Sequence, residues 1–166
     1  MLRRALGPAI AISLAVATAA IASPAPSFSA VKWPAWLSIE SPVNPYDSAT
    51  RGALFLVHGA LRDGTPSASD LTGSAEGLVN GTRRTIALHF DATPRPGVFA
   101  VRKQWPNEGT WMVRITLAAT SALVSIDRAG NVASARVPTQ LSSGMQIPRA
   151  ILAREIDSLL ADASRR

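Results

Sequence analysis

Short apolar runs separated by Gly, Pro, Asn and Asp fill the chain from Trp36 to about Pro138. Within several of these runs apolar and polar positions alternate, a period of two that is typical of half-buried strands. The run 53–60 is apolar at both parities, as expected for a strand in the middle of a sheet. The predicted strands are 36–40, 53–60, 70–79, 83–91, 97–105, 110–118, 121–127 and 132–138. This spacing predicts an all-β sandwich or barrel.

The C-terminal region changes to a helical period. Apolar residues recur at i, i+4, i+7, i+8 and i+11, which places them on one stripe of a helix over residues 145–164, with Pro148 near its first turn. The stripe consists of Leu152, Ile156, Leu159, Leu160 and Ala163. Such a C-terminal amphipathic helix either covers the sandwich or its edge, or binds a partner or a second copy.

The N-terminus has the three parts of a signal peptide. Met1–Arg4 is cationic, the next 17 residues are apolar and Ala-rich, and Ala20-Ile21-Ala22 has small residues at both positions that signal peptidase reads. We therefore expect an N-terminal signal helix within residues 1–22, cleaved after Ala22, with retention as an anchor as the alternative. Residues 23–35 are then an extended linker, and residues 36–140 form the sandwich. The mature protein is expected to be exported, periplasmic or secreted, and to contact the membrane only through the signal segment before cleavage.

The composition of the chain excludes several classes of function. A chain of 166 residues has room for one domain. The absence of Cys excludes disulfides, thiol catalysis and Cys-ligated metal sites. The net charge of +6 falls to +4 without Arg3 and Arg4, and the basic residues form no clustered stripe, so a nucleic-acid partner is not expected.

Residues 97–117 predict a hairpin with its apolar positions on one face. A register that pairs Trp105 with Trp111 places these apolar residues on one face. Gly109 then closes the turn with a positive φ. The same register sets Arg102 opposite Arg114 on the other face. Either an acidic side chain of a neighbouring strand lies between the two, or this candidate binding face meets an anionic partner.

A second hairpin is predicted over residues 122–137, with Val124 opposite Ala135. Its segment SIDRAGNVAS resembles the Asp-x-Ala-Gly-Asn turn in the last hairpin of bacterial immunoglobulin-like domains. The segment PGVFAVRKQWPNEGTWMVRI resembles the Pro-Gly-aromatic…Gly-x-Trp hairpin of exported YtkA/FixH-like domains. The resemblance implies an immunoglobulin-like antiparallel β-sandwich, here of about seven to eight strands. It also implies a small exported module, and the related CopC-like proteins handle copper.

Copper binding is therefore an alternative function. His58, His89 and Met112 are the candidate ligands, and Met145 is a further one. CopC-like sites use a His near the mature N-terminus or Met-rich segments, and this sequence has neither.

Hydrolase chemistry has weaker support. Ser74 and Asp91 could join His58 or His89, but no G-x-S-x-G elbow occurs in the sequence.

The remaining patterns have structural explanations. Trp33 and Trp36 could form a carbohydrate platform, whereas the hairpin register directs Trp105 and Trp111 to the core. Residues 71–84 carry three Gly, which mark close backbone approach in a strand and a turn at Asn80-Gly81. The sequence thus predicts a non-enzymatic binding or scaffolding module without a cofactor, whose partner is an unidentified protein or envelope component.

Overall fold

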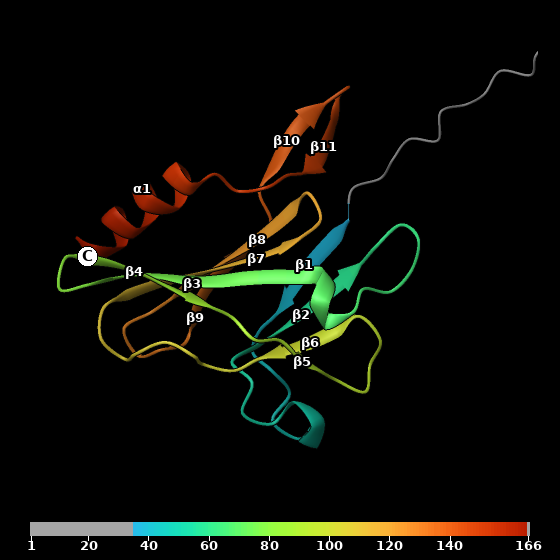
Figure 1. Ribbon diagram of the computed structural model, residues 1–166, viewed down its shortest axis with the longest axis horizontal. Helices are drawn as coiled ribbons and strands as arrows, with labels where there is room; N and C mark the ends of the chain where they lie inside the picture. Colours follow the sequence, from blue (N-terminus) through green and yellow to red (C-terminus); the bar gives the residue numbers. More distant parts are fainter. Residues whose placement is uncertain (1–34, 166) are drawn as a thin grey trace, which may run out of the picture. The chain divides into compact units, whose positions relative to one another are not determined.

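The computed structural model describes residues 35–165, which form one compact unit. The predicted signal peptide, most of the linker and Trp33 lie outside the described residues. Two antiparallel sheets pack face to face (Figure 1). One sheet has the order β1 (Trp36–Glu40), β2 (Phe55–Ala60), β6 (Val98–Val101), β5 (Asp91–Ala92). The other has the order β4 (Thr82–Ala87), β3 (Leu71–Val79), β7 (Thr110–Leu117), β8 (Thr120–Ile126), β9 (Val132–Arg136).

This strand order is immunoglobulin-like. The sheet β1-β2-β6-β5 corresponds to strands A, B, E and D, and β3, β7 and β8 correspond to C, F and G. β4 lies beside β3 and β9 is added beyond β8. The predicted all-β sandwich is therefore confirmed, although the two sheets of the described region have nine strands rather than the predicted seven to eight. The predicted strand 83–91 is in fact two strands, because the chain leaves β4 after Ala87 and crosses to the opposite sheet as β5.

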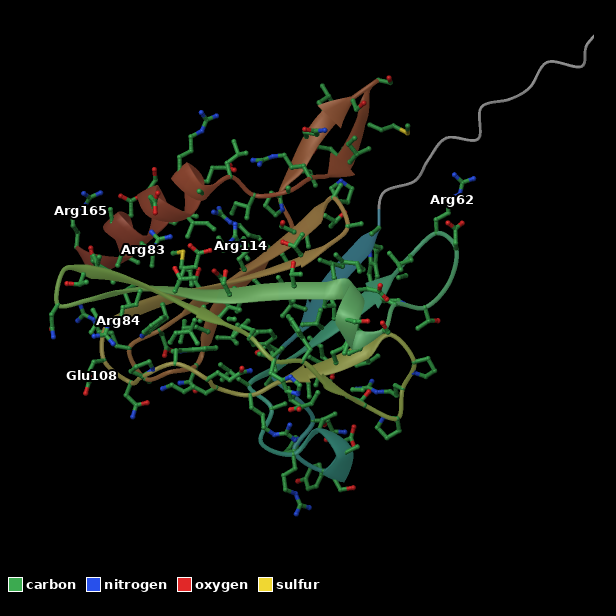
Figure 2. The ribbon with its side chains drawn as sticks, viewed as in Figure 1. Arg62, Arg83, Arg84, Glu108, Arg114 and Arg165 are labelled. Atoms are coloured by element: carbon green, nitrogen blue, oxygen red, sulfur yellow. The ribbon has the colours of Figure 1, made fainter. Side chains whose placement is uncertain are left out.

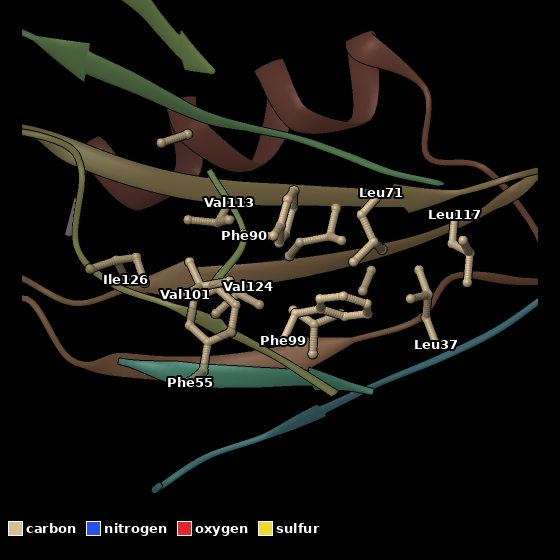
Figure 3. Packing of buried hydrophobic residues seen from close by; sticks show 14 of the residues in the cluster. Leu37, Phe55, Leu71, Phe90, Phe99, Val101, Val113, Leu117, Val124 and Ile126 are labelled. Carbon is tan, nitrogen blue, oxygen red and sulfur yellow. The ribbon is translucent and has the colours of Figure 1, made fainter. Parts of the chain in front are cut away.

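The core lies between the sheets and is built from alternate residues of the strands (Figure 3). Phe55 and Val57 of β2 face Val113 and Ile115 of β7 across it, all with no measurable exposure. The other face of β2 is also covered, because Leu56 packs beneath Val43 and Ala53 of the β1–β2 loop. This explains why the run 53–60 is apolar at both parities.

The predicted hairpin over residues 97–117 is wrong. β6 pairs with β2 and β5, whereas β7 pairs with β3 and β8, so the chain crosses from one sheet to the other between them. Trp105 and Trp111 are nevertheless both buried in the core. Alternation of apolar and polar residues identifies which side chains face inward. It does not show whether two strands pair in one sheet or face each other from opposite sheets, because the apolar residues point into the core in both cases. Gly109 has the expected positive φ, +90°.

The second predicted hairpin is confirmed with one irregularity. Val124 pairs with Ala135 as expected. A β-bulge between Ser125 and Ile126 then shifts the register, so that Ile126 pairs with Val132. The turn closes through Asp127, whose carboxylate accepts a 2.8 Å hydrogen bond from the backbone N–H of Asn131.

The C-terminal region contains a short hairpin before the helix. β10 (Thr139–Ser142) and β11 (Met145–Pro148) form a separate two-stranded sheet that projects from one end of the sandwich (Figure 1). Helix α1 spans Ala153–Ser164, so the predicted start near Pro148 is wrong. The predicted stripe packs through Ile156, Leu160, Leu159 and Ala163, while Leu152 is the exposed N-cap. α1 covers β3 and β7, as the first of the two expectations for this helix stated. The remaining elements are the 3-10 turns η1 (Ser48–Thr50) and η2 (Ala68–Asp70).

The glycines of β3 leave room for aromatic side chains that lie against the strand. A Cβ on Gly77 would lie 2.6 Å from Cδ2 of Trp111, and a Cβ on Gly73 would lie 2.7 Å from Cζ of Phe90. β3 ends in a turn at Asn80 and Gly81, both with positive φ, as expected for an Asn-Gly hairpin. Among residues 35–165, no helix is long and apolar enough to cross a membrane.

Candidate functional site

Arg102 and Arg114 do not form one face. Arg102 follows β6 and pairs with Asp91 of β5, whereas Arg114 lies on β7 in the other sheet and pairs with Glu76 of β3 at 3.1 Å. The predicted opposition of the two arginines is therefore wrong. Each arginine has its own acidic partner on a neighbouring strand, whereas a single acidic side chain between the two was expected.

A charged cluster lies between α1 and the five-stranded sheet. Glu76 is 5% exposed and contacts Arg83 and Arg114, and its Oε1 accepts a 3.0 Å hydrogen bond from the Ser74 hydroxyl. Arg83 also pairs with Asp157 of α1. Arg83 and Arg114 appear between α1 and the sheet in Figure 2. Since each charge has a partner of opposite sign, the cluster attaches the helix to the sheet and offers no unbalanced charge to a ligand.

A second ion pair fixes the start of α1. Arg149 donates to both carboxylate oxygens of Glu155, at 2.8 and 2.6 Å, and Glu155 also accepts the backbone N–H of Leu152 at 2.8 Å. The side-chain hydrogen bonds from Arg149, followed by the one from the Leu152 backbone, lower the pKa of Glu155 from 4.5 to about 2. The same pairing raises the pKa of Arg149.

Acidification should therefore weaken the N-terminus of α1. A lowered folded-state pKa means that the pair stabilises the fold fully above about pH 4.5, and that this contribution is lost as the pH falls through about 2. Glu155→Gln keeps an acceptor for Leu152 and removes the charge. We expect it to lower the urea midpoint near neutral pH, and the difference from the unmodified protein to disappear near pH 2.

Glu108→Gln is the matched control for this measurement, because Glu108 is exposed and has no ion pair within residues 35–165 (Figure 2). The midpoint of Glu108→Gln should stay close to that of the unmodified protein throughout. A midpoint difference for Glu155→Gln that persists unchanged at pH 2 would contradict the assignment.

The candidate copper ligands lie on three separate elements. His58 on β2 hydrogen-bonds Glu40 of β1 at 2.7 Å, and exposed His89, after β4, lies 3.3 Å from Asp91. Met112 is buried beneath α1. No group of three or more His, Asp or Glu that could hold a metal occurs within residues 35–165. The structure thus brings none of these three residues together.

The candidate Ser/His/Asp residues do not assemble either. Ser74 is buried on the helix-covered face of the five-stranded sheet, where it contacts Glu76 and Arg114. His89 and Asp91 lie beside the four-stranded sheet.

The tryptophans divide between core and surface. Trp105 and Trp111 are buried, and Trp111 Nε1 donates to the Glu108 carbonyl at 2.8 Å. Trp105 Nε1 has no hydrogen-bond acceptor within residues 35–165. Trp36 is exposed on β1.

The free edge of β9 is a site that the sequence did not indicate. β9 ends the order of the five-stranded sheet, and within residues 35–165 no strand pairs with its outer side. Its side chains are small and largely exposed, from Ala133 to Ala135. A backbone edge of this kind presents a row of N–H and C=O groups able to pair with another extended chain.

Two grooves border this edge. The first, here called the seam groove, has a volume of about 610 Å³ and lies between β9 and Ile39, Val43 and Leu54 of the other sheet and its loop. The second, here called the helix groove, has a volume of about 630 Å³ and lies between β9 and Leu159 and Ala163 of α1. Ala133 and Ser134 border both. A strand paired with β9 would therefore direct alternate side chains into the two grooves.

The grooves were missed because they depend on tertiary packing. Ala135 was expected opposite Val124, and it is, but the sequence did not indicate that β9 is the last strand of its sheet. The exposed small residues of 132–136 were the only available signal.

The strand order places the chain among immunoglobulin-like β-sandwich domains. Comparison with family models, with curated proteins and with solved structures finds no match.

Proposed function

We propose that the protein is an exported, non-enzymatic immunoglobulin-like module of the cell envelope that binds an extended segment of a partner protein along β9. The observation that carries the proposal is the unpaired edge of β9 with a groove on each side. Main-chain hydrogen bonds to an edge strand supply affinity, and grooves for alternate side chains supply specificity. The signal-like N-terminus and the resemblance to exported domains support the location.

The residues around β9 indicate which kind of partner segment would fit there. Ala133 and Ala135 allow a second backbone to approach, and the apolar walls formed by Ile39, Leu54 and Leu159 favour aliphatic side chains. Exposed Arg128 and Arg136 lie near the two ends of β9 and have no ion pair within the described region. A short aliphatic strand flanked by acidic residues fits this arrangement.

Site-specific cross-linking tests the proposal. With a photo-reactive residue at Ser134, the full chain in its own envelope should give a discrete cross-linked product. Ala133→Arg and Ala135→Arg fill the edge of the grooves at exposed positions, so each should remove the product while leaving the fold intact.

A matched control uses the other edge of the same sheet. Thr85→Arg changes an exposed position of β4, and it should leave the cross-linked product unchanged. A photo-reactive residue at Thr82 of β4 should give none. Equal products from β4 and β9, or a product that survives both β9 substitutions, would reject the site.

A further inference from the structure

We propose that the β10–β11 hairpin, together with Trp36, docks onto a lipid surface. Residues 137–148 contain no charged residue, although 17% of the chain is charged. Leu141 is 71% exposed and Met145 is 50% exposed, on either side of the Ser143-Gly144 turn. A two-stranded hairpin has no core of its own, so these apolar side chains project into solvent without a structural role.

Trp36 lies at the same end of the sandwich. The Ala35 carbonyl accepts a 2.6 Å hydrogen bond from the Thr120 hydroxyl, and the neighbouring Ser121 N–H donates to the Arg149 carbonyl at 3.1 Å. Arg149 N–H in turn donates to Pro138 at 2.9 Å, which closes the base of the hairpin. Trp36 is 54% exposed, and tryptophan favours the boundary between lipid and water.

The same end carries further small or amphipathic surface. The β7–β8 turn exposes Ala118 and Ala119, and Arg62 extends from the loop that follows β2 (Figure 2). Apolar side chains at the hairpin tip can insert into a membrane interface, and an exposed arginine on a neighbouring loop can contact lipid phosphate.

The position of the apolar N-terminal segment selects lipid over a protein partner. On the proposed export route, residues 5–21 are the membrane-inserted part of the precursor, and residues 23–34 join them to Ala35. Twelve extended residues reach at most about 40 Å. Since Ala35 lies at the hairpin end, this is the end that the precursor holds near the bilayer. The proposed β9 site, by contrast, lies along the side of the sandwich.

A fluorescent label at the hairpin tests the inference, since the chain has no Cys of its own. Ser142→Cys in a chain of residues 23–166 is labelled with nitrobenzoxadiazole and mixed with vesicles of phosphatidylethanolamine and phosphatidylglycerol. The emission should rise and shift to the blue, as the label leaves water. Ser48→Cys, in η1 at the opposite end, should show no change with the same vesicles.

Removing the apolar side chains separates insertion from non-specific adsorption. Leu141→Ser with Met145→Ser should weaken vesicle binding at least about tenfold, because both side chains lose their transfer from water. Tyr46→Ser, at a 92% exposed aromatic of the opposite end, should leave binding unchanged.

Three results would overturn lipid docking. These are no spectral change at residue 142 with vesicles, equal changes at residues 48 and 142, and a change that appears without lipid as protein concentration rises. The argument from residues 5–34 rests on the proposed export, whereas the vesicle measurement uses a chain without residues 1–22. A negative result therefore rejects membrane docking and leaves the β9 site to its own cross-linking test.

Discussion

Gly77→Ala is expected to lower the free energy of unfolding by about 2–3 kcal/mol, the cost typical of overpacking a dense core. The new methyl would lie 2.6 Å from Cδ2 and from Cζ3 of Trp111. Trp111 is 2% exposed and sits in the main core, so its ring has no free space to enter. For a chain of this size the thermal midpoint should fall by about 8 °C.

A double substitution identifies the cause. In a Trp111→Leu background the ring is gone, so adding Gly77→Ala should cost less than half of what it costs alone, and the coupling should appear in a double-mutant cycle. Urea unfolding measures all four proteins. Additive losses would mean that backbone strain, and not contact with the ring, is responsible.

Glu76→Ala should cost about 2 kcal/mol. Removal of one partner from a buried charge cluster costs about 3–5 kcal/mol, but Arg83 and Arg114 are each 36% exposed and recover part of their hydration. α1 should loosen as well, because Arg83 also holds Asp157. Urea unfolding followed by tryptophan fluorescence measures the loss, and amide exchange in α1 measures the loosening.

Asp157→Ala is the matched control for Glu76. Asp157 is 59% exposed and pairs with the same Arg83, so its removal should cost no more than about 1 kcal/mol. Equal losses for Glu76→Ala and Asp157→Ala would show that burial of Glu76 does not determine its contribution.

The pattern of the sequence predicted strands well because alternation reflects burial on one side. β1 matches its predicted range, and β3, β7 and β8 differ from theirs by a residue at one or both ends. Pairing was harder to predict. Phe99 and Ile115 share the inward parity, yet they belong to opposite sheets, and alternation alone does not distinguish a neighbour in the sheet from a neighbour across the core.

The C-terminal errors have a similar origin. Ser143-Gly144 is a turn signal, but the strands on either side of it have only four residues each, too few for alternation to mark them as strands. The helical stripe was read correctly, but α1 begins only after Leu152, where Glu155 and Arg149 fix its first turn. The free edge of β9 follows from strand order, which no local pattern encodes.

The position of α1 after every strand has a consequence for the order in which the molecule is completed. Met112 and Leu123 on the outer face of the five-stranded sheet are covered by Ile151, Ile156 and Leu160, all from the last segment of the chain. During synthesis, which proceeds from the N-terminus, the chain can therefore assemble both sheets while this apolar patch is still bare. The patch closes only when residues 151–160 are present, so a protease or chaperone that recognises bare apolar surface would distinguish chains that lack this segment from chains that carry it.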